Sequence, residues 1–122
     1  MVVTNARFHL TRRAAGDLRA IHRHSLEEWG EETARAYMAK LYAAMAAVAE
    51  RPETGLLRRH RSAPFRMVPA GRHFVVYDAT DIGIIILTVL HQRRDIERII
   101  AGFTPDFLEQ VAALRRDAKR RL

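Results

Sequence analysis

The stretch FVVYDATDIGIIILTVLHQRRD, Phe74–Asp95, decides the fold that we expect for this chain. Its aromatic and β-branched start, Phe74–Tyr77, is typical of a strand, and the residues Asp78–Asp81 are typical of a turn. The run Ile82–Leu90 is apolar apart from one glycine and one threonine, and it lacks the alternation of a strand with one face in water. It therefore predicts a central strand that is covered on both faces of the sheet.

A polar cluster, His91-Gln92-Arg93-Arg94-Asp95, follows this strand directly and should lie at one edge of the sheet. His91 is a candidate acid or base, but a histidine that ends a strand can equally just satisfy backbone groups. Asp95 is expected to cap a short helix that ends before Gly102. One of the two arginines would then pair within the chain, and the other would contact a partner.

Two long helices are predicted before this stretch. Arg7–Thr11 alternates enough for a short strand, and the Thr11 side chain is a plausible N-cap for a helix that runs to Trp29. Gly30 should end that helix in a left-handed conformation. A second helix, Glu31–Arg51, follows and is stopped by proline. Because one glycine separates them, these helices should form an antiparallel hairpin.

The sheet is expected to be a three-stranded antiparallel meander. Phe65–Val68 predicts its first strand and Pro69–Arg72 a turn into the strand at Phe74, while Phe8–Leu10 could add a fourth strand. Pro52–Pro64 has no periodicity and is predicted to be a loop. The segment Thr104-Pro105-Asp106 is a strong start for a C-terminal helix.

These elements indicate an α+β fold: an N-terminal strand, a long helical hairpin packed on a small antiparallel sheet, and an extra C-terminal helix. A chain of 122 residues fits one domain, in which residues 1–101 form the main body and residues 102–122 a helical extension of the same domain. The N-terminus has no long apolar segment, so we expect no signal peptide, no membrane contact and a cytoplasmic location.

The chain is strongly basic, with 21 lysine and arginine residues against 14 aspartate and glutamate residues and a formal charge of +7. Such a balance suits an anionic partner, although it also describes an ordinary soluble surface. The segment from Thr54 to Tyr77 contains no acid and five arginines: Arg58, Arg59, Arg61, Arg66 and Arg72. These arginines are candidates for partner contact, although a run of charges in a loop is usually only solvated.

No metal or cofactor site is expected. The absence of cysteine excludes disulfides, thiol catalysis and thiolate metal sites. His22 and His24 are two residues apart on a helix, whereas metal-binding pairs on helices usually sit four apart. The stripe of Tyr37, Met38, Leu41 and Met45 is more easily explained as hairpin core than as a cofactor-binding surface. Part of it could instead form a groove for a partner helix.

The order of these motifs resembles the ParE branch of the RelE/ParE toxin superfamily, over about the first four fifths of the chain. The matching residues are Phe8–Thr11, Ala14, Asp17-Leu18, Trp29-Gly30, Ala49–Pro52, Gly55, Arg66, Gly71-Arg72, Phe74–Tyr77 and Val89–Asp95. The resemblance implies the toxin of a type II toxin–antitoxin system that poisons DNA gyrase and forms a hetero-oligomer with a ParD-like antitoxin. Nucleic acid would be contacted only indirectly.

Site residues follow from the resemblance as predictions. The candidates for target binding are Arg58, Arg59, Arg61, Arg66, Arg72, Arg93 and Arg94. The candidates for antitoxin binding are Leu18, Ile21, Tyr37, Leu41 and Met45. One alternative is a ribosome-dependent mRNA endonuclease of the RelE type that uses His91, but the chain has no tyrosine beyond Leu90 and no carboxylate or lysine among the arginines. Another is a toxin-derived protein that has kept only antitoxin binding.

Overall fold

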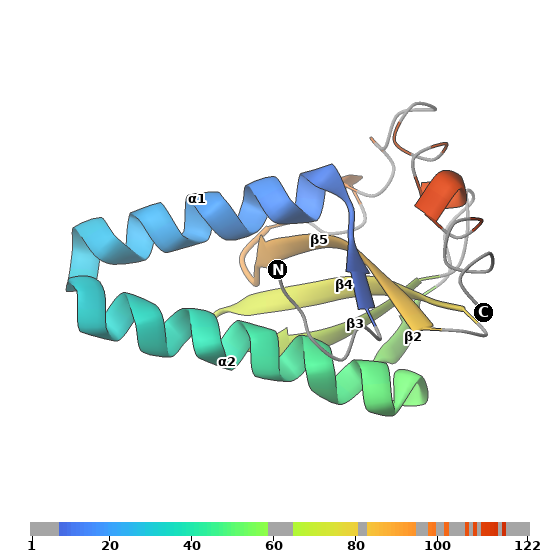
Figure 1. The fold of residues 1–122 in the computed structure, drawn as a ribbon, viewed down its shortest axis with the longest axis horizontal. Helices are drawn as coiled ribbons and strands as arrows, with labels where there is room; N and C mark the ends of the chain where they lie inside the picture. The colour runs from blue at the N-terminus through green and yellow to red at the C-terminus, as the bar shows by residue number, and fades with distance from the viewer. Residues whose placement is uncertain are drawn as a thin grey trace.

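A five-stranded sheet carries a long helical hairpin on one face, as Figure 1 shows. The computed structural model describes residues 8–58, 65–80, 83–94, 98–99, 102, 107, 109, 111–114 and 116. The helices are α1 (Arg12–Trp29) and α2 (Glu31–Glu50), and a 3-10 turn follows at Pro52–Thr54. The strands are β1 (Phe8–Leu10), β2 (Leu56–Arg58), β3 (Phe65–Ala70), β4 (His73–Thr80) and β5 (Gly83–His91). The α+β fold expected from the sequence is confirmed.

The strand order β1-β5-β4-β3-β2 places β5 inside the sheet. The predicted meander of β3, β4 and β5 is confirmed, and β1 adds as a fourth strand, parallel to β5. Residues Ile84–Leu90 of β5 are all buried, as the uninterrupted apolar run predicted. Ile84 and Ile86 face the hairpin, while Ile85 and Leu87 pack in a second cluster on the opposite face.

Three expectations about the sheet were wrong. The predicted loop Pro52–Pro64 contains the edge strand β2, which pairs antiparallel with β3. Only three residues pair, which is too short a run to show a strand period. Thr80 and the two residues before it extend β4 instead of forming a turn. Pro69 lies inside β3, where it is tolerated because β2 pairs only with Phe65–Met67 and leaves the next part of that edge unpaired.

The hairpin begins as predicted at Thr11. Its hydroxyl accepts a hydrogen bond from the Ala14 amide (3.0 Å) and donates one to the Leu87 carbonyl (2.9 Å), so one side chain caps α1 and ties it to β5. The Asp17 carboxylate accepts hydrogen bonds from the Val89 amide (3.0 Å) and from the Thr88 hydroxyl. These bonds fix the orientation of α1 across the sheet.

Gly30 joins the helices in a conformation different from the predicted one. Its φ of 86° is positive, but its ψ of 174° is extended rather than left-handed helical. That combination is open essentially to glycine alone. The hairpin therefore needs glycine at this position because φ is positive, as predicted. The predicted left-handed helical conformation itself is not adopted.

Part of the tail covers the sheet face opposite the hairpin. Val111 is buried there with Phe65 and Met67, and Phe107 and Leu114 pack against the same cluster. The described tail residues from position 107 to 116 are helical, in agreement with the predicted C-terminal helix. The predicted start of that helix, Thr104-Pro105-Asp106, lies outside the described residues, as does the predicted cap Asp95.

Candidate functional site

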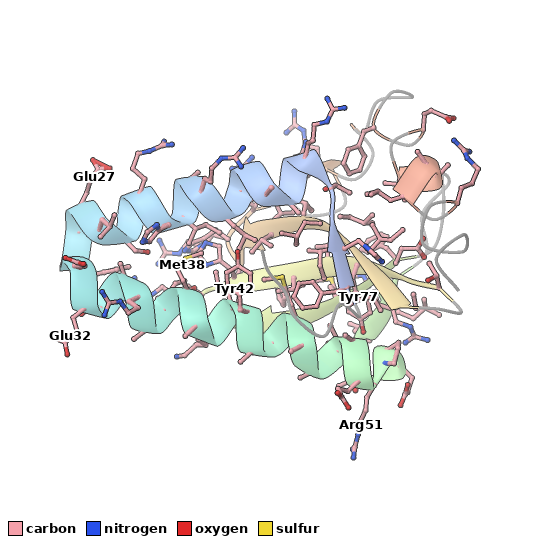
Figure 2. The ribbon with its side chains drawn as sticks, in the orientation of Figure 1. Glu27, Glu32, Met38, Tyr42, Arg51 and Tyr77 are labelled. Atoms are coloured by element: carbon pink, nitrogen blue, oxygen red, sulfur yellow. The ribbon has the colours of Figure 1, made fainter. Side chains whose placement is uncertain are left out.

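A groove of about 750 Å³ runs between the two helices. It is lined by Leu10, Ala15, Leu18, Arg19, His22, Leu26, Glu31, Arg35, Met38 and Tyr42. Figure 2 shows Met38 and Tyr42 of α2 in the space between the helices. Leu26 and Tyr42 are large apolar side chains with 38% and 41% of their surface exposed. The groove therefore combines accessible apolar surface with flanking charged side chains, which are the basic Arg19 and the ion pair of Arg35 with Glu31.

The residues predicted to bind an antitoxin lie mostly on the inner side of the hairpin. Leu41 and Met45 are fully buried and Leu18 nearly so, in the cluster that holds the hairpin on the sheet. Ile21 and Tyr37 are partly buried against the same cluster. Of the five, only Leu18 also lines the outer groove. Antitoxin binding through them remains a prediction, and the structure gives Leu41 and Met45 a packing role.

The predicted target-binding arginines do not form one patch. The Arg66 guanidinium donates to the carbonyl of Gly55 (2.8 Å) and to that of Glu53 (3.4 Å), so it holds the turn before β2. Arg58 is paired opposite Phe65 near that end of the sheet and makes an interaction of its own. Arg59 and Arg61 lie outside the described residues. Target binding by these four arginines remains a prediction.

Arg72, Arg93 and Arg94 gather at the other end of the sheet, and we call them the arginine corner. The Gln92 amide donates to the Arg72 carbonyl (2.9 Å), and the Arg94 amide donates to the His91 carbonyl (2.9 Å). These backbone bonds tie the turn before β4 to the turn after β5. All three arginine side chains are exposed. The structure thus brings these cations together, through backbone bonds that do not use their guanidinium groups.

His91 ends β5 next to His73, its partner in the β4–β5 register. The two rings meet edge to face, with centroids 5.3 Å apart. The His91 Nδ1 accepts a hydrogen bond from the Arg93 amide (3.1 Å). Its predicted structural role, the satisfaction of a nearby backbone group, is confirmed. Its role as a catalytic acid or base remains a prediction.

His73 is held by Tyr37, which reaches down from α2. The Tyr37 hydroxyl lies 2.5 Å from the His73 Nδ1 and also accepts from the Arg72 amide (2.9 Å). Because the Arg72 amide already donates to this oxygen, we assign the hydroxyl hydrogen to the bond with the His73 Nδ1, which places the His73 ring hydrogen on Nε2. Burial, the largest cause, and the positive charges of His91 and His24 together lower the pKa of His73 to about 4. His73 is therefore neutral at pH 7.

This depressed pKa predicts an acid-sensitive contribution to stability. The unfolded chain takes up a proton at His73 near pH 6.5, whereas the folded chain does so near pH 4. The free energy of unfolding should therefore fall as the pH drops through that window, by about 1–2 kcal/mol after allowance for partial exposure to solvent. Urea unfolding at pH 7 and pH 4.5 measures it. The His73→Gln variant keeps an acceptor for Tyr37 and should lose less stability over the same window; an equal loss would contradict the assignment.

His73 and Trp29 were not selected as site residues from the sequence. The Arg72 guanidinium lies 5.1 Å from the centre of the Trp29 ring, and the His24 ring meets the same indole edge to face. His73 is paired with His91 by the register of β4 and β5, which the sequence alone does not give. Trp29 could not be found either, because it approaches from the hairpin.

Within the part of the chain that the structure describes, no cluster of three or more His, Cys, Asp or Glu side chains is arranged to hold a metal ion. Among the same residues, no helix is both long and apolar enough to cross a membrane. The site is thus built from a groove on the hairpin and a basic corner at one end of the sheet.

Comparisons with known proteins match most of this chain. The family model described as the ParE toxin of the type II toxin–antitoxin system parDE matches residues 8–96. Toxin ParE1 of Caulobacter vibrioides is 35% identical over 85 residues, which is 70% of this chain and 88% of that relative. Toxin ParE1 of Mycobacterium tuberculosis H37Rv is 30% identical over 95 residues, which is 77% of this chain and 97% of that relative. The resemblance inferred from the motifs is confirmed.

A solved structure described as the chromosomal ParDE TA system from P. aeruginosa has a similar fold. It aligns with a TM-score of 0.60 and 21% identity, and the match covers 69% of this chain and 92% of that chain. At this identity the likeness concerns the fold alone. The family match ends at residue 96, so the sequence from residue 97 onward lies outside it.

Proposed function

We propose that this chain, which belongs to the ParE toxin family of type II toxin–antitoxin systems, arrests growth by binding DNA gyrase and is held inactive by a small ParD-like antitoxin. The observation that carries the proposal is the match of family motifs over residues 8–96, together with separate surfaces for two partners. The hairpin groove suits an antitoxin helix, and the arginine corner suits an acidic surface of gyrase.

The hairpin groove supports antitoxin binding through its shape and composition. An amphipathic helix needs an apolar floor, and Leu18, Leu26, Met38 and Tyr42 supply one. The basic residue Arg19 among the lining side chains favours acidic flanks on the bound helix.

The sheet edge at β2, which has no strand beyond it among the described residues, supports a second mode of antitoxin binding. β2 stands at the end of the strand order, and Leu56 and Leu57 on it are 62% and 40% exposed. An extended segment of a partner can add a strand to such an edge through main-chain hydrogen bonds. Together, the groove and the edge fit an antitoxin with one helical and one extended segment.

Acidic substitutions in the groove should weaken antitoxin binding. The double variant Leu26→Asp, Tyr42→Asp places charge on exposed apolar surface without touching the buried core. Its affinity for the cognate antitoxin should fall about 100-fold or more, because two apolar anchors are lost and acid faces an acidic partner. Isothermal titration calorimetry measures the affinity. The matched control Ala36→Asp, Ala39→Asp adds the same two acids at exposed positions of α2 that do not line the groove, and it should bind normally.

If the control lowers the affinity for the antitoxin equally, the effect comes from total charge and the assignment of the groove is wrong. The exposed apolar side chains Leu56 and Leu57 provide the independent comparison: Leu56→Asp tests the sheet edge alone. If only the edge variant loses affinity, the antitoxin binds by strand addition and the helical part of the proposal is wrong.

The gyrase part of the proposal is tested with purified protein, gyrase and supercoiled plasmid, beside a ribosome and mRNA cleavage reaction. We expect linear, gyrase-linked DNA or lost supercoiling, with intact mRNA. The hydrogen bond from the Arg93 amide to the His91 Nδ1 favours a binding role, because it leaves the neutral ring with its hydrogen on Nε2 and no free base. Cut mRNA with unaffected gyrase would replace this function by the RelE-type endonuclease, and harmless expression with tight antitoxin capture would indicate a chain without toxicity.

A further inference from the structure

A small cavity of about 220 Å³, lined mostly by apolar surface but with several polar groups, lies between the hairpin and one end of the sheet. The hairpin extends beyond the sheet at this end (Figure 1). Its walls come from the second half of α1, from Tyr37 of α2, from the β3–β4 turn and from the end of β5. The described residues that line it include Arg72 and the three histidines His24, His73 and His91, but no aspartate or glutamate. The cavity is therefore lined by donors and a cation without a compensating acid.

The hydrogen bonds around the cavity determine which ring nitrogens carry hydrogen. The Nδ1 atom of His91 accepts from the Arg93 amide, and the Nδ1 atom of His73, which lies 2.5 Å from the Tyr37 hydroxyl, is assigned as the acceptor of that hydroxyl hydrogen. A neutral imidazole whose Nδ1 accepts carries its hydrogen on Nε2. Both rings consequently offer an N–H group, and neither offers a free base.

Arg72 adds a positioned positive charge. Its guanidinium carbon lies 5.1 Å from the centroid of the Trp29 ring, and this cation–π contact restrains a side chain that lines the cavity. The turn that carries it is fixed from both sides, because the Arg72 amide donates to Tyr37 and the Arg72 carbonyl accepts from Gln92. A Cβ on Gly71 would overlap the Tyr37 ring, so this close approach requires glycine.

We propose that this cavity binds a phosphate monoester group through Arg72, His73 and His91. The donors come from the β3–β4 turn and from β5, with His24 of α1 on a further side, and this arrangement suits a tetrahedral anion with three free oxygens. A planar carboxylate would use one side of an arginine fork and leave the other donors unpaired. The volume lies below the range of about 300–1,000 Å³ typical of pockets that enclose a drug-sized ligand. The cavity thus takes a phosphate group and leaves the rest of the ligand outside.

The phosphate site shares Arg72 with the arginine corner, but phosphate binding can be measured without gyrase or an antitoxin. Free phosphate, a nucleotide and the 5′ end of a DNA strand share the same terminal group, and the probes separate them. Inorganic phosphate, adenosine 5′-monophosphate with adenosine as control, and a DNA trinucleotide with and without a 5′-phosphate are titrated at constant ionic strength. Calorimetry gives the affinity, and imidazole ¹⁵N spectra report on His73 and His91.

The structure predicts saturable binding of inorganic phosphate with shifts centred on these two rings, and the larger ligands should bind only when phosphorylated. Arg72→Ala should weaken binding about tenfold or more through loss of a charge-assisted contact. Arg51→Ala is the matched control, because it removes the same charge from the far end of α2, where Figure 2 shows the side chain pointing away from the body. It should leave the affinity unchanged within about twofold.

Two further variants keep the test decisive if Arg72→Ala folds poorly. Arg72→Lys retains the charge but loses the planar fork, and it should weaken binding several-fold. Tyr37→Phe removes the hydroxyl that positions His73. This variant should release the His73 Nδ1 and change the tautomer that the ¹⁵N spectrum reports. Phosphate binding should weaken at the same time. The proposal would be overturned by any of three results. These are an equal loss of phosphate affinity in the Arg51 and Arg72 variants, chemical-shift changes spread over the whole chain, and the absence of saturable binding.

Discussion

Replacing both Arg93 and Arg94 by alanine is expected to abolish growth arrest and to leave antitoxin capture unchanged. Both side chains are exposed at the arginine corner, while their backbone amides make the hydrogen bonds that hold the turn. Alanine keeps those amides, so the fold should survive. Two exposed cations at the centre of an interface would together contribute about 2–4 kcal/mol, which corresponds to a loss of gyrase affinity of roughly 30- to 1,000-fold.

The matched control removes the same charge from a different surface. Lys40→Ala, Arg51→Ala changes two exposed cations on α2 and also lowers the formal charge from +7 to +5. Growth after induction and gyrase binding at fixed ionic strength are measured for both double variants. If the variant without Arg93 and Arg94 remains toxic, the assignment of gyrase binding to the arginine corner is wrong. Equal rescue by the control would show that the effect depends only on overall basicity.

The central strand and the helical hairpin are the parts of the fold that could be predicted from the sequence. β5 was predicted correctly because its unbroken apolar run leaves few alternatives to a strand buried on both faces. The hairpin was predicted because Thr11, Gly30 and Pro52 mark its boundaries with residue types of restricted backbone or capping behaviour. These signals depend only on residues that are close together in the sequence, so they could be recognised without knowledge of the fold.

The contacts that depend on distant partners could not be predicted in the same way. Arg66 was grouped with the loop arginines by composition, but its guanidinium donates to Gly55 and Glu53, eleven and thirteen positions earlier. Tyr77 was predicted as a strand residue, yet its hydroxyl accepts from the Gly55 amide and donates to the Pro52 carbonyl. A Cβ on Gly55 would overlap that hydroxyl. Such pairings require the sheet register, which no single segment encodes.

The helical stripe shows a further limit of periodicity. Spacing identified Leu41 and Met45 as one apolar face of α2, but it did not decide whether that face meets the sheet or a partner. In the structure it meets the sheet. The groove lies on another side of the hairpin, where the exposed side chains of Leu26 and Tyr42 line it together with Leu18 and Met38. The groove that they line forms only when the two helices pack side by side, so the sequence of either helix alone does not indicate it.

The second large effect is expected in the tail, where Val111→Asp should lower the free energy of unfolding by about 2–4 kcal/mol. Val111 is 9% exposed and packs with Phe65, Met67 and Leu87 on the face opposite the hairpin. A carboxylate there either remains unpaired among apolar side chains or forces the tail off the sheet. Urea unfolding followed by circular dichroism measures the loss.

The exposed residue Arg116 on the same helix supplies the control. Arg116→Asp breaks only a surface ion pair with Glu109 and should cost about 1 kcal/mol or less. Deletion of residues 102–122 should cost at least as much as Val111→Asp and should increase binding of an apolar dye, because the covered face becomes exposed.

The result also decides what the sequence beyond the family match contributes. If Val111→Asp destabilises the chain and Arg116→Asp does not, the tail completes the core by covering a sheet face that holds Ile85 and Leu90. Growth arrest would then decline in parallel with stability. If both variants keep the wild-type stability but one loses gyrase or antitoxin affinity, the tail is a partner-binding segment. That outcome would contradict its role as a cover for the sheet.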